Sequence, residues 1–104
     1  MEKLNKMMFE EIVDTDGEAC LVLFSRESCH VCKGLKVLLG ELEQEYSDLP
    51  FYTVDVEQER ELFARFGLKG VPQTLFFRDG EQVAKISGEA EEDAFIDQIE
   101  ALLN

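Results

Sequence analysis

The chain has 104 residues, and its 23 acidic and 10 basic side chains give a formal net charge of −13 at pH 7. That length suits one domain, and the negative charge opposes binding to nucleic acid or to anionic membrane surfaces. With 45% hydrophobic residues, 2 Pro and 7 Gly, disordered and low-complexity classes are excluded. There is no long apolar run and no secretion signal at the start, so we expect one soluble, monomeric domain over residues 1–104, located in the cytoplasm.

The first half of the chain alternates between helical and strand-like patterns. Residues 6–14 have apolar side chains at helical spacing and predict a helix, while residues 1–5 fit either an edge strand or part of that helix. The run ACLVLF at 19–24 is typical of a strand buried on both faces of a parallel sheet. An apolar stripe over 32–46 predicts a second helix, and FYTVDV at 51–56 predicts a second strand. Strands that alternate with helices pair in parallel.

The second half predicts a helix, a hairpin and a final helix. An acidic segment with apolar residues on one side is expected to form a helix that ends at Gly67. Residues 73–78 and 81–87 flank Asp79-Gly80, which favours a tight antiparallel hairpin. Residues 89–103 predict a terminal helix. Its expected first turn holds four acids that suit the helix dipole: Glu89, Glu91, Glu92 and Asp93. The whole pattern indicates an α/β domain.

The segment SCHVCK places Cys29 and Cys32 three positions apart, where the first buried strand gives way to a helix. A thiol at that point lies at the positive end of the helix dipole, where free backbone N–H groups stabilise a thiolate. Cys29 is therefore the expected nucleophile. Cys32 lies one turn further in, within reach of a mixed disulfide at Cys29, and is the expected resolving thiol.

A metal site is the alternative use of such a pair, and the ligand count opposes it. A closed zinc site needs four ligands, and beyond the pair the chain offers only Cys20 and His30. We therefore expect no metal and no other cofactor. Cys20 fits a small buried hydrophobe. His30 either tunes the Cys29 thiolate or is an exposed residue at a helix start.

Basic residues gather around the pair. Arg26, Lys33 and Lys36 are three of the ten basic residues of the chain, and Glu27 is the only acid among them. Such a positive island favours a thiolate, although a solvated helix face would give the same pattern.

The segment GVPQT places Pro72 at the threshold of the strand 73–78. A proline cannot donate to a sheet ladder, so it belongs at the first residue or at an edge. The Val71–Pro72 bond can be cis if a tight turn demands it, or an ordinary trans bond that ends a loop.

Taken together, SCHVCK, DVEQ, FGLKGVPQT, LFFRDGEQV and the glycine at 88 resemble the thioredoxin family over residues from about Phe9 to Leu103. The resemblance implies the thioredoxin-like fold, a central mixed sheet of four to five strands flanked by helices. It also implies that the Val71–Pro72 bond is cis, that Pro72 packs against the cysteine pair, and that the Val71 backbone binds an extended substrate polypeptide. Lys33 follows the second cysteine as in thioredoxins, and with His30 it is a candidate supporting residue.

Several positions depart from the family pattern W-C-G-P-C-K and its surroundings. The two tryptophan positions hold Ser25 and Ser28, the central Gly-Pro is His30-Val31, and the helix-kinking proline is Val37. The buried Asp and its Lys partner, which move a proton at the resolving thiol, correspond to Leu23 and Thr53. We therefore expect a thioredoxin-like protein other than the housekeeping thioredoxin.

Two functions compete on this basis. The first is a thiol–disulfide oxidoreductase that reduces protein disulfides through Cys29 and Cys32, re-reduced by a donor that the sequence does not identify. The second is an interaction or redox-sensing module that uses the same groove with little turnover, favoured by the missing Asp, Lys and Trp. A glutathione-dependent, glutaredoxin-like enzyme is a third option.

Overall fold

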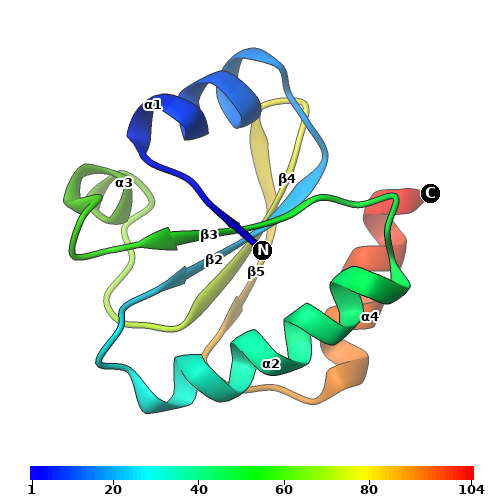
Figure 1. The fold of residues 1–104 in the computed structure, drawn as a ribbon. Coiled ribbons are helices and arrows are strands. Elements are labelled where there is room, and N and C mark those ends of the chain that lie inside the picture. Colours follow the sequence, from blue (N-terminus) through cyan, green and yellow to red (C-terminus); the bar gives the residue numbers. More distant parts are fainter.

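The computed structural model describes residues 1–104 and shows a five-stranded mixed sheet with helices on both faces (Figure 1). The strands run in the order β1-β3-β2-β4-β5. They are β1 (Glu2–Lys3), β2 (Cys20–Ser25), β3 (Phe51–Asp55), β4 (Gln73–Arg78) and β5 (Glu81–Ser87). The helices are α1 (Lys6–Phe9) with its wider, π-helical continuation η1 (Glu10–Thr15), α2 (His30–Glu45), α3 (Arg60–Arg65) and α4 (Glu92–Leu103). The expected α/β architecture is confirmed.

The strand pairings follow the predicted order of elements. β2 pairs in parallel with β3, and β1 adds to the outer edge of β3, also in parallel. β4 runs antiparallel to β2, and β5 antiparallel to β4. The β4–β5 turn uses Asp79 and Gly80 at φ values of 54° and 81°, the left-handed region that a two-residue hairpin turn requires. Both the parallel pair and the closing hairpin are confirmed.

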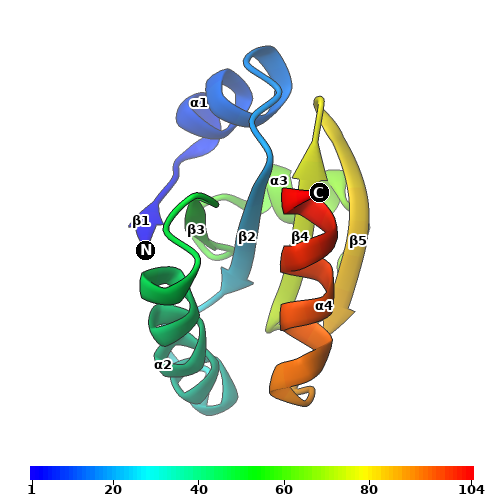
Figure 2. The same cartoon turned by 90° about the vertical axis from the view of Figure 1, so that its right-hand side faces the viewer.

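The sheet is covered on both faces, which explains the continuous apolar run of β2. All six residues of β2 are buried. Val22 and Phe24 face the layer of α1 and α3, whereas Leu21 and Leu23 face the layer of α2 and α4. Figure 2 shows α2 and α4 side by side against one face of the sheet. A central strand buried on both faces holds the turn that follows it in a fixed place.

Apart from β4 and β5, the elements with a predicted range differ from it by one to three residues at one end or both. Residues 1–5 contain the short strand β1 at the sheet edge. α2 begins at His30, two residues early, because Cys29 caps it. α4 begins only at Glu92, so the prediction that Glu89 and Glu91 lie in its first turn is wrong. Gly88 turns the chain there at φ 72°, and Glu91 is extended and serves as the N-cap. None of the helices is both long and apolar enough to cross a membrane.

Candidate active site

Cys29 is the N-cap of α2. Its backbone is extended, with φ −86° and ψ 111°, and its Sγ accepts a hydrogen bond from the backbone N–H of Cys32 at 3.1 Å. The first N–H groups of a helix have no partner within the helix, and a side chain at the N-cap satisfies one of them. Here that side chain is a cysteine, so the sulfur lies at the electropositive end of a 16-residue helix.

Cys29 and Cys32 form a disulfide, with their Cα atoms 5.2 Å apart. Cys32 is fully buried, whereas Cys29 is only partly buried. The outer sulfur is therefore the one that a large reagent can approach. The structure brings together the two cysteines that the sequence singled out, with the exposure that their expected roles require.

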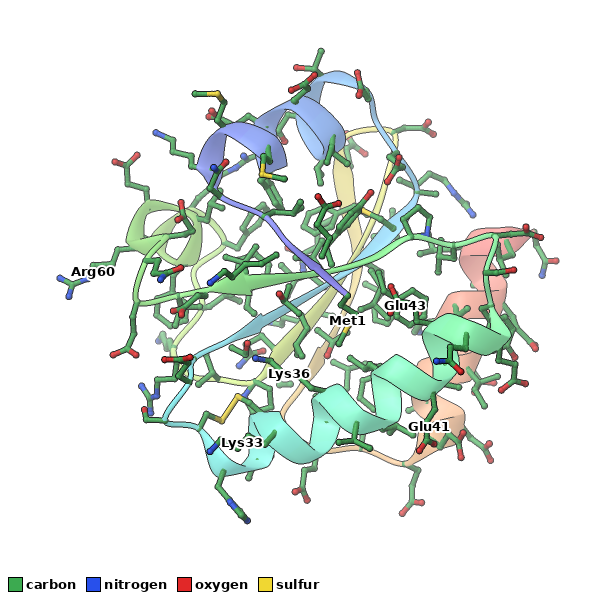
Figure 3. The ribbon with its side chains drawn as sticks, viewed as in Figure 1. Met1, Lys33, Lys36, Glu41, Glu43 and Arg60 are labelled. Atoms are coloured by element: carbon green, nitrogen blue, oxygen red, sulfur yellow. A yellow bond between two sulfur atoms is a disulfide. The ribbon has the colours of Figure 1, made fainter.

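The basic residues near the pair have no acidic partners. Arg26 and Lys33 are exposed and Lys36 is partly exposed. The ion pairs of the chain lie elsewhere and join the Met1 ammonium to Glu43, Lys6 to Glu61, and Arg65 to Asp14. Figure 3 labels Lys33 and Lys36 on the first turns of α2, the part of the helix that carries the yellow disulfide. Their positive charge is therefore not neutralised by a contacting carboxylate.

The Val71–Pro72 peptide bond is cis, as the resemblance implies. Pro72 is buried and Val71 is partly buried. Because Phe24 on β2 lies opposite Gln73 on β4, Pro72 lies beside the end of β2, from which the chain turns to Cys29. The Pro72 carbonyl accepts a hydrogen bond from the N–H of Gly88 at 2.9 Å, which ties this turn to the end of β5. The cis peptide and the cysteine turn thus lie at the same end of the central strands, where β2 ends and β4 begins.

The layer of side chains behind this end of the strands contains no acid. Leu23 lies between Thr53 on β3 and Thr74 on β4, and all three are buried. The only buried polar residues of the chain are Ser25, Thr53 and Thr74, and the hydroxyl of Thr74 has no hydrogen-bond partner. Sequence reasoning missed Thr74. The apolar run that follows it, residues 75–77 of the same strand, was the signal that could have placed it inside, because all three of those residues are buried as well.

The remaining two sequence candidates stand apart from the pair. His30 is exposed, and its side chain makes no hydrogen bond or ion pair. Cys20 is fully buried at the far end of β2, as predicted, and burial, helped by Glu18, raises the pKa of its thiol from 9.0 to about 12. A thiol with so high a pKa is not a nucleophile at neutral pH. The structure contains no group of three or more His, Cys, Asp or Glu side chains placed to hold a metal ion.

Two hollows mark the surface. The larger, about 380 Å³, lies at the β3–α3 turn, away from the cysteines, and its lining has no hydrophobic residue: Lys6 and residues 57–61. The smaller, about 220 Å³, lies beside α2 and is lined by Gly34, Leu35, Leu38, Glu89 and Ala90. Neither could be found from the sequence, because the walls of each come from segments more than fifty residues apart.

Comparison with known proteins agrees with this arrangement. The thioredoxin family model matches residues 1–101. The chain is 32% identical to thioredoxin from Ovis aries over 101 residues, which is 96% of this chain and 91% of that protein. It is 31% identical to thioredoxin from Homo sapiens, with the same coverage.

Solved structures agree as well. A mutant thioredoxin from Halobacterium salinarum superposes with a TM-score of 0.88 at 27% identity, over 99% of this chain and 90% of that one. Thioredoxin from Fasciola hepatica superposes with a TM-score of 0.87 at 26% identity, over 97% and 98% of the two chains. With a cysteine pair at disulfide distance, these likenesses identify a protein-disulfide oxidoreductase. The chain belongs to the thioredoxin family.

Proposed function

We propose that the chain works as one thioredoxin-like domain over residues 1–104, which reduces protein disulfides in the cytoplasm with Cys29 as the attacking thiol and Cys32 as the resolving thiol. The observation that carries the proposal is the hydrogen bond from the Cys32 N–H to Cys29 Sγ at the start of α2. It supports the proposal that the helix terminus stabilises the partly exposed sulfur as a thiolate in the reduced protein.

The first step is attack by the reduced protein on a substrate disulfide. The Cys29 thiolate donates an electron pair to one substrate sulfur, and a new S–S bond forms as the substrate S–S bond breaks. The leaving sulfur departs as a thiolate and takes up a proton from water. The end of α2 and the unpaired charges of Arg26, Lys33 and Lys36 favour the thiolate form of Cys29.

The second step releases the reduced substrate. Cys32 loses its proton and attacks Cys29 Sγ, so that the protein disulfide forms and the second substrate sulfur leaves as a thiolate, which is then protonated. Two electrons have passed from the protein to the substrate. Because no acidic side chain is buried in the protein, we propose that water accepts the Cys32 proton. An external dithiol donor or reductase then returns two electrons to the pair, which needs no other cofactor.

Val71 and Pro72 are the proposed binding residues for the substrate chain. They lie at the cis peptide just before β4, beside the end of β2 where the cysteine turn begins. An extended polypeptide that pairs with the Val71 backbone would run past Cys29, and hydrogen bonding of this kind is independent of substrate sequence. We propose that Lys33 favours the Cys29 thiolate through its electrostatic field. For His30 we propose a supporting role of the same kind, without a direct contact to the sulfur.

An interaction or redox-sensing module remains the second candidate. The observation that favours it is the apolar layer behind the pair, where Leu23 lies between two threonines instead of a buried acid and its partner. Without an internal base, the resolving step is slower at neutral pH, and a protein that forms mixed disulfides without releasing them quickly would suit capture of a partner.

Reduction of insulin by a dithiol donor separates the two functions. We expect turnover with the wild type, and loss of turnover in Cys29→Ser and Cys32→Ser. Cys20→Ala is the matched control and should keep the wild-type rate, because Cys20 is buried at the other end of β2. Turnover that needs glutathione would identify the glutaredoxin-like alternative. A wild-type rate no higher than that of the donor alone would contradict the enzyme and support the module.

A further inference from the structure

The notch of about 220 Å³, the smaller of the two hollows, has an apolar wall and lies beside α2, the helix that begins at the cysteine pair. Its lining consists of Leu35 and Leu38 from α2, Ala90 and Glu89 from the β5–α4 connection, and Gly34, which follows Cys32 by two residues. The far ends of the same two helices are joined by the hydrogen bond from Tyr46 to Glu100 at 3.0 Å. Figure 2 shows α2 and α4 side by side, and the lining residues locate the notch between the first half of α2 and the connection that leads into α4.

A glycine is among the residues that line the notch. A side chain built at Gly34 would meet nothing within 4 Å, and Gly34 is exposed within a regular helix. A glycine in a helix interior costs about 1 kcal/mol relative to alanine, so this position carries a cost in stability that packing does not explain. The absence of a side chain here leaves room for an external apolar group against Leu38 and Ala90.

The acidic side chains at the rim of the notch have no ion-pair partners. Glu89 lines the notch, and three further exposed acids follow it at the start of α4: Glu91, Glu92 and Asp93. None of these four takes part in an ion pair. The basic residues Lys33 and Lys36 belong to the same part of α2 but do not line the notch. A ligand in the notch would therefore meet apolar carbon at the base and negative charge at the rim.

We propose that this notch is a specificity subsite for the substrate polypeptide, which receives one apolar side chain that has a Lys or Arg next to it in the sequence. The proposal rests on the proposed function, since the occupant is the same chain that carries the disulfide. Seven residues of α2 separate Cys29 from the centre of the notch, a rise of about 10 Å at about 1.5 Å per residue. An extended peptide covers that distance in about three residues. The preferred apolar residue is thus about three positions from the reacting cysteine.

Peptides capped with thionitrobenzoate test this in a single turnover. Each peptide has one cysteine held in a mixed disulfide with the coloured group. The reduced protein attacks the peptide sulfur, releases thionitrobenzoate, and then forms its own disulfide as the peptide thiol leaves. Four peptides carry Leu-Lys, Ser-Lys, Leu-Glu or Ser-Glu about three residues from the cysteine, and a second set places the pair on its other side. We expect the Leu-Lys peptide of one set to react about tenfold faster than the Ser-Glu peptide.

Two variants locate the effect. Gly34→Leu should fill the notch and reduce the Leu-over-Ser preference to below about twofold. Glu89→Lys should reverse the preference for Lys over Glu. Gly40→Leu is the matched control, because Gly40 lies on the same helix with open space around it and outside the notch, and it should keep both preferences.

The small disulfide dithiobisnitrobenzoate tests the proposed function independently of the proposed subsite. The wild type and the control Gly40→Leu should reduce it at the same rate, because the reagent does not reach the notch and Gly40 lies outside the lining of the notch. Failure of the wild type to reduce it would contradict the proposed function itself. Equal rates for all peptides with an active wild type, or preferences unchanged in Gly34→Leu, would overturn the subsite and leave the proposed function intact.

Discussion

Cys29 and Cys32 are linked twice, by the disulfide and by the hydrogen bond from the Cys32 N–H to Cys29 Sγ at 3.1 Å. The hydrogen bond is a cap of α2 and involves only the backbone of Cys32. It therefore does not depend on the disulfide, and we expect it to persist when the bond is reduced. In that state the donor would face a thiolate, and hydrogen bonds to charged acceptors are stronger than those to neutral ones.

The unpaired lysines of α2 should lower the pH at which Cys29 ionises. The double variant Lys33→Gln/Lys36→Gln removes two charges near the sulfur, and at low salt we expect the midpoint of Cys29 alkylation by iodoacetamide to rise by about half a pH unit. Lys85→Gln on β5 is the control and should not move it. An unchanged midpoint in the double variant would show that these charges belong only to a solvated helix face.

Burial of Cys20 should make the protein sensitive to alkali. The raised pKa of about 12 means that the native thiol stays protonated while the unfolded thiol ionises above its ordinary value of 9.0. Stability is thus unaffected below about pH 9 and falls as the pH rises toward the native pKa. Tyr52, whose pKa is raised by burial and by its hydrogen bond to Glu18, acts in the same direction.

Urea denaturation at a series of pH values measures this loss. We expect Cys20→Ala to lose less stability than the wild type between about pH 8 and 11, since it has no thiol to ionise on unfolding. Parallel curves for the two proteins would contradict the assignment.

The hydroxyl of Thr74 is buried without a hydrogen-bond partner. A buried unsatisfied polar group costs about 1–3 kcal/mol, so Thr74→Val should raise the free energy of unfolding by about 1 kcal/mol. The measurement is urea denaturation of the oxidised protein. Thr53→Val on β3, across β2 from Thr74, is the control, because the Thr53 hydroxyl is not among the buried groups without a partner, and it should gain less. A destabilised Thr74→Val would show that the hydroxyl has a partner in solution.

Gly40 tests the energetics of the long helix. A methyl group there would meet nothing within 4 Å, so Gly40→Ala should stabilise the protein by about 1 kcal/mol through helix propensity alone. Gly67→Ala is the contrasting variant. Gly67 ends α3 at φ 65°, where an alanine is strained, so it should lower the melting temperature while Gly40→Ala raises it. The opposite order of melting temperatures would refute this view of both helices.

Local signals in the sequence predicted most of the fold. The bounds of β4 and β5 agree with the prediction to the residue, because Asp79-Gly80 determines both the turn and the ends of the strands beside it. The capping position of Cys29 was predictable for the same reason, since a buried strand and an apolar helical stripe meet there. The start of α4 was not predictable. Each of the acids from Glu89 onward suits the first turn of a helix, and the turn at Gly88 decides which of them begins it.

Long-range features could not be predicted from one sequence. The order β1-β3-β2-β4-β5, the unsatisfied hydroxyl of Thr74, and the notch between Gly34 and Ala90 all depend on contacts between segments distant in the chain. The resemblance to thioredoxins supplied the cis bond before Pro72, which the residues alone left open between cis and trans. Physical reasoning on the sequence thus reached the two cysteines, but not the surfaces that would select a substrate.

Mapping of the mixed disulfide tests the central claim most directly. A reduced protein with Cys32→Ser, mixed with a disulfide-containing peptide and digested after acid quenching, should carry the peptide on residue 29 in nearly every molecule. Cys29→Ser should carry little peptide on Cys32 over the same time, because that sulfur is buried. Adducts that form on Cys32 as fast as on Cys29 would contradict the assignment of the attacking and resolving thiols.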